Sequence, residues 1–404
     1  MFSGDLVQQK VIHMPGMVSI LATFAAVISS LSLLMPASPS WVALGGTGAM
    51  GAGSVTAVLM ASTVATQLFV VQRLLAKLGW TFTLVAGTLL MGLASPIQAI
   101  APDLTLALVS SILRGIGFGI ITVSGSTALS LLIPVERRGQ AVGIYGLAAA
   151  IPQMILTPLT PWMIETFGYR FVLCSGLIAV LGAPFAFHLG QLVTERLGEI
   201  AEENTEPPAG MGVVLKKIWP ALATLTLITA AGGAFLTFSI DIAPTAAAAS
   251  IALLCFTVIA APARVMGGSL SDRFGTRLFM TPVLGLAALG AALIGFSIPA
   301  HDTVLRWILL ICGSLLVGIG YGFLQSITMV RALNDAGAAN TTRASVAWNA
   351  NFDLGTGLGG IALGTMAQAA GFPFAWYAWA GLMAVSVVAM GARDMRETHT
   401  NSPK

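Results

Sequence analysis

The chain has 404 residues, of which 56% are hydrophobic and 9% are charged, and its net charge is +3. Soluble globular domains carry about 25% charged residues, so this composition excludes an ordinary soluble protein. A lipid bilayer is the expected surrounding of most of the chain. The sequence has no stripe or run of basic residues, which argues against nucleic acid as a partner.

Apolar segments long enough to cross a membrane recur along the whole chain. A transmembrane helix needs about 20 apolar residues, and charges, prolines and glycine-rich breaks separate twelve such segments. The pattern predicts an all-α, multi-pass membrane protein. The predicted spans are 14–35, 50–71, 81–101, 105–133, 140–163, 171–193, 218–240, 246–267, 278–299, 306–330, 344–369 and 373–391. The first is longer than a signal-peptide core, so we interpret it as a membrane helix.

Basic residues are unevenly distributed between the predicted loops. With the N-terminus in the cytoplasm, 16 of the 19 lysines and arginines fall in cytoplasmic segments. Arg170 and Arg306 fall outside, and Arg114 lies within a span. This bias predicts cytoplasmic N- and C-termini in the inner or plasma membrane of the cell. The cytoplasmic set is Lys10, Arg73, Lys77, Arg137, Arg138, Arg196, Lys216, Lys217, Arg264, Arg273, Arg277, Arg331, Arg343, Arg393, Arg396 and Lys404.

The most hydrophilic segment lies in the middle of the chain. Residues 194–217 contain four of the acidic residues within a span of eight positions, followed by Pro207 and Pro208. We interpret this segment as a cytoplasmic linker. It divides the chain into an N-terminal six-helix bundle, 1–193, and a C-terminal six-helix bundle, 218–404.

The two predicted bundles repeat one another in sequence. Gly-Ile-Gly-Phe-Gly at 115–119 matches Gly-Ile-Gly-Tyr-Gly at 318–322, with an offset of 203. The turn at 77–79 matches the turn at 273–275, with an offset of 196. Six spans separate the two copies, so both begin on the same side of the membrane. Such a parallel repeat, with a pseudo-two-fold axis along the membrane normal, is typical of transporters that alternate access by rocking one bundle against the other.

Three motifs resemble those of the major facilitator superfamily. The segment Gly-Ser-Leu-Ser-Asp-Arg-Phe-Gly-Thr-Arg at 268–277 is similar to its loop between the second and third helices of a half. Arg114 with the glycines at 115–119 resembles its fourth-helix motif. Residues 132–143 are similar to the loop before the fifth helix in bacterial drug:proton antiporters. The resemblance implies the twelve-helix facilitator fold and a transport function.

Two segments depart from the family pattern. The first-half loop at 72–79 has Ala76 where the family has an aspartate. The glycine-rich antiporter motif of the fifth helix is reduced to Gly-Leu-Ala-Ala-Ala-Ile-Pro at 146–152, and a glycine-rich segment stands in span eleven instead.

Two ionisable residues are predicted near mid-membrane, where charges are costly and mark functional sites. Arg114 and Asp353 each lie about nine residues inside a span, roughly 13–14 Å deep at 1.5 Å per residue. Val317 is the counterpart of Arg114 in the repeat, so the fold does not require a charge there. By the resemblance, Arg114 steers the protonation of a carboxylate or binds an anionic substrate. The alternative is a structural hydrogen bond to helix carbonyls.

Asp353 stands in a polar stretch of span eleven. Asn349 and Thr356 lie four residues before and three residues after it, so the three share a helix face. Burial penalises the charged form of a carboxyl group, which is what a proton carrier requires. The alternative is an aspartate that is permanently bonded to its neighbours or to an arginine.

The loop at 268–277 is the predicted inner gate. Its gating residues are Gly268, Asp272, Arg273, Gly275 and Arg277. An aspartate is favoured near a helix N-terminus, and by the resemblance Asp272 binds near the start of span five, around Arg138 and Gly139. The alternative is an ordinary surface turn. Polar residues predicted to line the cavity, by their positions on spans one, four, seven and ten, are Ser29, Ser111, Thr237 and Gln325.

These features predict a monomeric secondary transporter that expels a small amphipathic compound in exchange for protons. Its expected partners are a small-molecule substrate, protons and the lipid bilayer. The alternatives are a proton-coupled importer of a sugar or organic acid, a membrane enzyme, and a receptor or scaffold derived from a transporter. We expect no cofactor and no metal, because the histidines are scattered and no phosphate-binding Gly-Lys-Ser/Thr loop is present.

Overall fold

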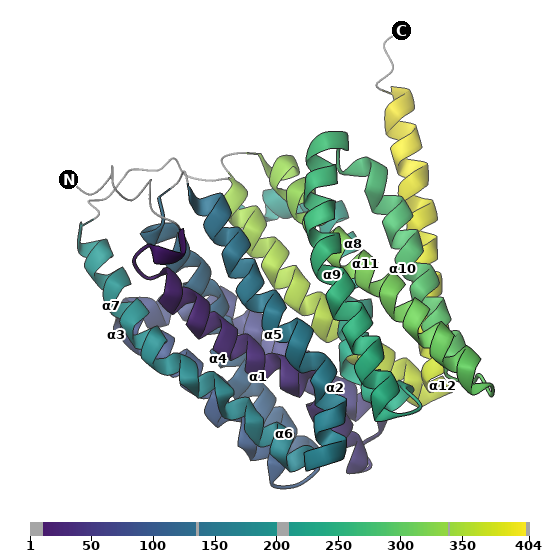
Figure 1. Ribbon diagram of the computed structural model, residues 1–404. Helices are drawn as coiled ribbons and strands as arrows, with labels where there is room; N and C mark the ends of the chain where they lie inside the picture. Colours follow the sequence, from purple (N-terminus) through teal and green to yellow (C-terminus); the bar gives the residue numbers. More distant parts are fainter. Residues whose placement is uncertain (1–10, 135–136, 200–209, 338–339, 401–404) are drawn as a thin grey trace. The chain divides into compact units, whose positions relative to one another are not determined.

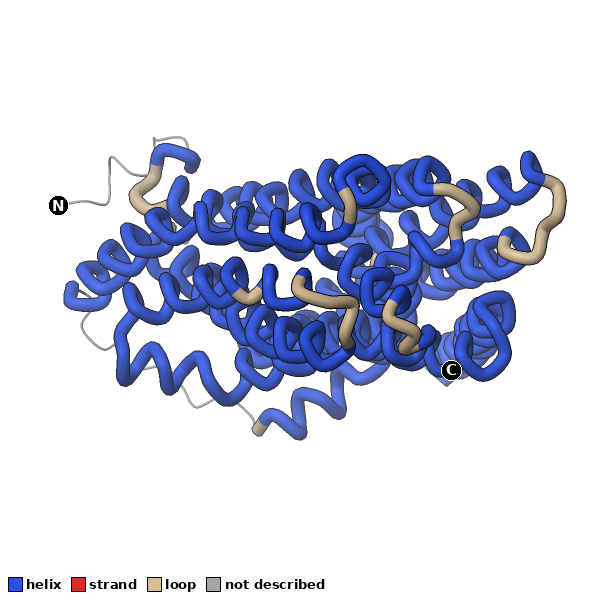
Figure 2. The backbone as a smooth tube through the Cα atoms, turned by 90° about the horizontal axis from the view of Figure 1, so that it is seen from below, coloured by secondary structure: helices blue, strands red, loops and turns tan. Residues whose placement is uncertain are grey.

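The computed structural model describes residues 11–134, 137–199, 210–337 and 340–400. Over these residues the chain forms helices joined by short loops and contains no strand, as Figure 2 shows. The prediction of an all-α fold is confirmed. The chain is divided into two compact units.

Unit 1 consists of residues 1–46 and 58–205. In chain order (Figure 1), its α-helices are α1 (Met17–Leu44), the end of α2 (Gly48–Ala65), α3 (Val71–Leu93), α4 (Leu104–Leu132), α5 (Arg138–Phe167), α6 (Tyr169–Ser175) and α7 (Ala183–Glu199). A π-helical turn, Thr66–Val70, joins α2 to α3, and 3-10 turns occupy Val11–His13, Ser95–Ala99 and Gly176–Gly182.

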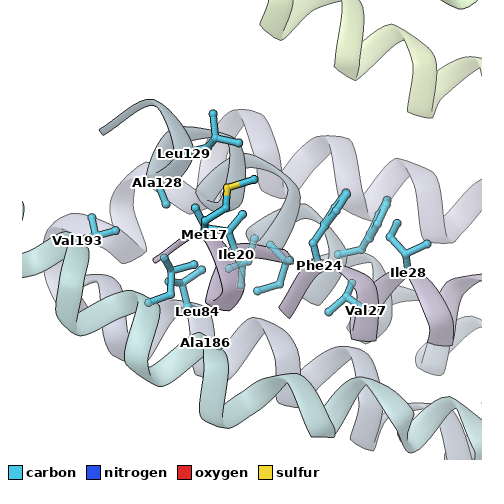
Figure 3. Close-up of a cluster of buried hydrophobic side chains, with 14 of the residues drawn as sticks. Met17, Ile20, Phe24, Val27, Ile28, Leu84, Ala128, Leu129, Ala186 and Val193 are labelled. Atoms are coloured by element: carbon cyan, nitrogen blue, oxygen red, sulfur yellow. The ribbon is translucent and has the colours of Figure 1, made fainter. Parts of the chain in front are cut away.

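The core of unit 1 forms around α1. Figure 3 shows Met17, Ile20 and Phe24 of this helix among buried side chains of α3, α4 and α7, including Leu84 and Leu129. The Phe24 ring stacks on Tyr145 of α5, with ring centroids 4.2 Å apart. Apolar side chains therefore cover α1 from several helices at once, which explains why it is the most enclosed helix of this unit.

Unit 2 consists of residues 47–57 and 206–404. It contains the first part of α2 and helices α8 (Met211–Ile242), α9 (Ala246–Phe274), α10 (Arg277–Ser297), α11 (Thr303–Ala336) and α12 (Thr341–Thr400). Helix α11 packs against α9 and α10, and α12 packs against α8 and α10. Figure 1 shows α9, α10 and α11 running side by side.

Ten helical stretches in the described residues are long and apolar enough to cross a membrane. The chain is thus a multi-pass membrane protein. Two stretches, Gly48–Ala99 and Arg343–Met390, have 52 and 48 residues, more than one crossing requires. Each is interrupted by a glycine with non-helical backbone angles, Gly79 and Gly371. The count of twelve separate crossings stays a prediction.

Some predicted spans differ from the observed helices. The first continues past 35 through Pro36 and Pro39 to Leu44. The sixth, 171–193, is not one α-helix, because 3-10 turns occupy its middle at Gly176–Gly182. The boundaries predicted for the bundles and linker stay predictions, since the linker includes 200–209, which lie outside the described residues.

The internal repeat reappears in the packing of matching helices. A side chain added at Gly115 of α4 would collide with the carbonyl oxygen of Leu59 in α2, and one added at Gly318 of α11 would collide with that of Phe256 in α9. Leu59 and Phe256 are 197 positions apart, and the two glycines are 203 apart. The same backbone contact is therefore made in each unit. These offsets identify equivalent positions: 197 for α2 and α9, and 203 for α4 and α11.

Candidate functional site

Arg114 is buried in unit 1, with 1% of its surface exposed. Its Nε and Nη2 atoms have no hydrogen-bond partner among the described residues. Ser111, one turn earlier on α4, is also buried, and its hydroxyl likewise has no partner in the described part of the chain. A buried N–H without an acceptor costs about 1–3 kcal/mol, and more when it is charged. The fold therefore maintains this arginine at a cost to stability.

A second polar group forms in unit 2 at the meeting of three helices. Arg264 of α9 donates from Nη2 to Oε1 of Gln325 on α11. Tyr321, one turn before Gln325, lies beside the Gln325 side chain and interacts electrostatically with both Arg264 and Asp353 of α12. We call Arg264, Tyr321, Gln325 and Asp353 the unit 2 cluster. It holds one permanent cation and one carboxyl group in a largely apolar surrounding.

Local packing holds the unit 2 cluster in place. The Ser326 hydroxyl donates to the carbonyl oxygen of Arg264 at 2.6 Å, which ties α11 to α9 beside the arginine. A side chain at Gly232 of α8 would collide with the ring of Tyr321, so glycine there lets the tyrosine fit against α8. Tyr321 and Gln325 are 4% and 3% exposed. The cluster therefore has fixed geometry.

Aromatic rings surround Tyr321. Its ring centroid lies 5.1 Å from that of Phe256 on α9 and 6.1 Å from that of Phe352 on α12. Phe352 stacks on Trp348, whose indole nitrogen donates to Thr328 at 3.0 Å. The cluster thus combines a few charged groups with packed aromatic rings, and apolar linings with a few polar groups are typical of small-molecule sites.

The residues predicted around Asp353 separate into two groups. Asp353 is 6% exposed, and Thr356 is also buried and donates to the carbonyl oxygen of Phe352. Asn349 is exposed instead, and its amide donates to Ser345 of its own helix at 2.8 Å. Asn349 therefore differs from Asp353 and Thr356 in burial, and its part in a shared polar stripe stays a prediction.

Asn351 was missed by sequence reasoning. Its amide donates to the carbonyl oxygen of Leu222 at 2.9 Å and to the hydroxyl of Thr226 at 3.0 Å, both on α8. Asparagine in a membrane helix that bonds to a neighbouring helix strengthens the packing of the two. This contact orients the face of α12 that carries Asp353.

Arg264 was also missed as a site residue. The sequence analysis counts it with the cytoplasmic basic residues, and the structure places it on α9, within a candidate membrane span, Ala246–Ser271, beside Gln325. The signal that could have found it is its position within the apolar run, eight residues before the motif aspartate, Asp272. Tyr321 could have been found as the one difference between the two glycine motifs.

The four predicted cavity residues lie in different surroundings. Ser29 is buried and donates to the carbonyl oxygen of Ala25, within its own helix. Thr237 donates to Gly233 and shares a hydrogen bond of 3.0 Å with Thr56, from the part of α2 that belongs to unit 2. Gln325 belongs to the unit 2 cluster. Ser111 lies one turn from Arg114. Of the four predicted residues, only Gln325 and Ser111 lie near a buried charged side chain.

The gating loop is partly described. Gly275 has a φ of 83° and ends α9, as a left-handed glycine does at a helix C-terminus. Arg273 is exposed, with its guanidinium 5.1 Å from the ring centroid of Phe274, and a side chain at Gly268 would meet open space. The side chains of Asp272, Arg277 and Arg138 are not among those that the structure describes. The predicted latch is therefore untested.

A metal site finds no support in the described residues, which contain no group of three or more histidine, cysteine, aspartate or glutamate side chains placed to hold an ion.

Apolar helices that repeat in two units, each with its own buried ionisable residues, are typical of multi-pass membrane proteins of the solute-transporter class. The sequence model of the Major Facilitator Superfamily matches residues 18–350 and 221–404. The chain belongs to this superfamily, and it is a membrane transporter of the facilitator kind.

Curated relatives match short parts of the chain. An uncharacterized MFS-type transporter of Bacillus subtilis (strain 168), YhcA, is 30% identical over 110 residues, which cover 26% of this chain and 19% of that protein. A second from the same organism, YcnB, is 32% identical over 74 residues, which cover 18% and 16%. The chain thus aligns with less than a fifth of the length of either relative.

Solved transporters share the fold over nearly the whole chain. A peptide transporter, POT, in complex with sulfate has a TM-score of 0.71 at 14% identity, with 96% of both chains covered. The nucleoside transporter NupG has a TM-score of 0.68 at 15% identity, with 94% of this chain and 98% of that chain covered. At such low identity the likeness establishes the fold alone.

Proposed function

We propose that the protein is a proton-coupled secondary transporter that moves a small amphipathic compound by alternating access, with Asp353 as its proton-binding group. The observation that carries the proposal is the burial of Asp353 beside Tyr321, in a cluster that also contains Arg264. A carboxyl group in this setting changes its charge when it takes up a proton. That change alters the electrostatics of the whole cluster.

Arg114 has the complementary role in the proposal. Its charge is permanent, so it cannot carry a proton itself. Its Nε and Nη2 atoms, which have no acceptor among the described residues, are suited to one that comes and goes, such as the substrate or a carboxylate in one state of the cycle. Within unit 2, the aromatic rings near Tyr321 supply apolar contacts for the body of the compound, with Gln325 as a polar contact.

The direction we propose is export. Its support is the likeness of residues 132–143 to the loop before the fifth helix in bacterial antiporters. Import of an organic acid is the second candidate, because Nε of Arg264 and Nε2 of Gln325, which have no acceptor within the described ranges, favour an anion. We also propose twelve crossings, a monomer in the cell membrane, cytoplasmic termini, and Asp272 with Arg273 as the inner latch.

Membrane vesicles test both coupling and direction. Inside-out and right-side-out vesicles containing the full chain are energised with a pH gradient and given ethidium, benzoate or glucose as test compounds. Export predicts accumulation in inside-out vesicles, and import predicts accumulation in right-side-out vesicles. In both cases the test compound also discharges the pH gradient, which a pH-sensitive dye records.

Asp353→Asn tests the proton-binding group. This variant should lose gradient-driven accumulation but keep exchange of labelled for unlabelled compound, because exchange needs no net proton movement. Asp103→Asn is the matched control. Asp103 accepts a hydrogen bond from the backbone N–H of Leu106 at the start of α4, and asparagine caps a helix equally well. Uphill accumulation retained in Asp353→Asn would remove this residue from the mechanism.

A further inference from the structure

Two N–H donors of the unit 2 cluster have no acceptor among the described residues. They are Nε of Arg264 and Nε2 of Gln325. The two side chains are already joined through Nη2 and Oε1, so the unused donors lie on one bonded pair. Burial of such donors is unfavourable unless an acceptor reaches them.

We propose that the substrate carries a carboxylate group, which Arg264 and Gln325 bind. The proposal names the substrate class of the proposed function and rests on its proton coupling, and it favours import, the second candidate direction. A carboxylate has two oxygen atoms that accept in parallel, and the planar guanidinium matches this geometry. One oxygen accepts from Arg264, and the other is available to the amide of Gln325.

The charge balance of the cluster favours a single negative charge. Arg264 and the ionised form of Asp353 together are neutral, and both interact with Tyr321. Arg331, the nearest further arginine on α11, pairs instead with Asp335 at 3.5 Å and donates to Met280. A carboxylate that enters the cluster therefore leaves one excess negative charge, and a proton on Asp353 removes it. Because buried charge must be balanced, the acid and the proton bind together.

Joint binding has a consequence for direction. A transporter that binds proton and substrate in the same state moves both the same way. An inward proton gradient then drives import of the acid. The carboxylate site thus supports the second candidate direction over export.

The apolar surroundings indicate the rest of the molecule. Phe256 and Phe352 lie beside Tyr321, and Trp348 stacks on Phe352. An aromatic or similarly flat apolar body is complementary to these rings. The expected substrate class is a small aromatic or aliphatic monocarboxylic acid.

Paired acids and amides test the carboxylate directly. The purified full chain is heated in detergent at pH 6 with benzoate, phenylacetate or cinnamate, or with the corresponding neutral amide of each. A ligand that binds the folded state raises Tm. At least one acid should raise Tm by about 2–4 °C, and its amide should have less than about a tenth of the affinity, as expected when a charged hydrogen bond worth about 1.5–3 kcal/mol is lost.

Variants assign the effect to the site. Arg264→Gln should abolish the difference between acid and amide. Arg264→Lys keeps the charge without the planar fork and should retain a weakened preference for the acid. Arg306→Gln is the matched control, because Arg306 is a half-buried arginine at the start of α11 that donates to the carbonyl oxygen of Ile242. The Arg306→Gln variant should prefer the acid over its amide, as the unaltered chain does.

Two sets of results overturn the proposal. Equal stabilisation by every acid and its amide would do so, and so would a preference for the acid that persists in Arg264→Gln. Failure of the proposed function would look different. If an acid binds through Arg264 but no compound moves protons in vesicles, proton coupling is wrong and the carboxylate site stands. If a neutral or cationic compound moves protons and no acid binds, the carboxylate site is wrong and proton coupling stands.

Discussion

One helix contact in unit 1 and its equivalent in unit 2 have the same packing but different chemistry. In unit 1, Gln67 donates to Thr122 at 3.1 Å between the π-helical turn and α4. In unit 2, Arg264 donates to Gln325 between α9 and α11. Gln67 and Arg264 are 197 positions apart, and Thr122 and Gln325 are 203 apart. These are the same offsets that relate the two glycine contacts. A neutral pair is enough to pack these helices, so the charge of Arg264 serves another purpose.

At another pair of equivalent positions in α4 and α11, the charge lies in unit 1 instead of unit 2. Arg114 of α4 is equivalent to Val317 of α11, and both are buried. The offset of 203 also makes Phe118 of α4 the counterpart of Tyr321 of α11, and, applied to α5 and α12, it makes Ala150 the counterpart of Asp353. Each unit thus carries charges where the other has none. Because the fold repeats, each charged residue can be tested by replacing it with the residue at the equivalent position of the other unit.

The largest effect should come from Arg114→Val, which gives unit 1 the residue of unit 2. Transport should fall at least about a hundredfold, as expected for the loss of about 3 kcal/mol of charged contacts. Thermal stability should rise, because the variant removes N–H groups that are buried without an acceptor. Transport in proteoliposomes and Tm in detergent measure the two effects.

The reverse substitution, Val317→Arg, should lower Tm. A lowered Tm in Arg114→Val would show instead that the guanidinium stabilises the fold through bonds to helix carbonyls. That result would support the structural role that sequence reasoning left open for this arginine.

A smaller effect is expected from Tyr321→Phe, which gives unit 2 the phenylalanine of unit 1. The variant keeps the ring contacts but removes the hydroxyl that interacts with Arg264 and Asp353. Loss of a polar interaction of about 1.4 kcal/mol lowers a rate about tenfold. Gradient-driven uptake at several pH values measures it. Tyr377→Phe is the control, because Tyr377 packs on Phe296 outside the cluster and should transport normally.

Sequence reasoning predicted the features that depend on composition and repetition. Apolar length predicted the helices, and the glycine motifs predicted the repeat, because close helix packing requires small residues at fixed spacing. The positions of Arg114 and Asp353 deep in apolar runs correctly predicted their burial. These properties follow from local sequence alone.

The rest of the site depends on contacts between helices. Arg264 stands near the end of an apolar run and looks like any cytoplasmic arginine until Gln325 is placed beside it. Asn349 and Asn351 are equally polar in sequence, and only the packing of α12 against α8 decides that Asn351 makes the contact. Hydrophobic periodicity cannot decide this, because the helix is apolar on nearly every side.

The smallest effects should occur where the two units are the same. Gly168, which precedes α6, has φ 82° and ψ 161°, and Gly371, 203 positions later in α12, has φ 86° and ψ 158°. This backbone region is essentially restricted to glycine, and another residue there costs about 1–3 kcal/mol. Gly168→Ala and Gly371→Ala should therefore lower Tm by similar amounts and leave proton coupling intact. Gly198→Ala, in open space on α7, should leave Tm unchanged or raise it, because alanine is the better helix former. If only one of the paired variants lowered Tm, the junctions would not be equivalent, and the counterparts assigned to Asp353 and Arg114 would need separate proof.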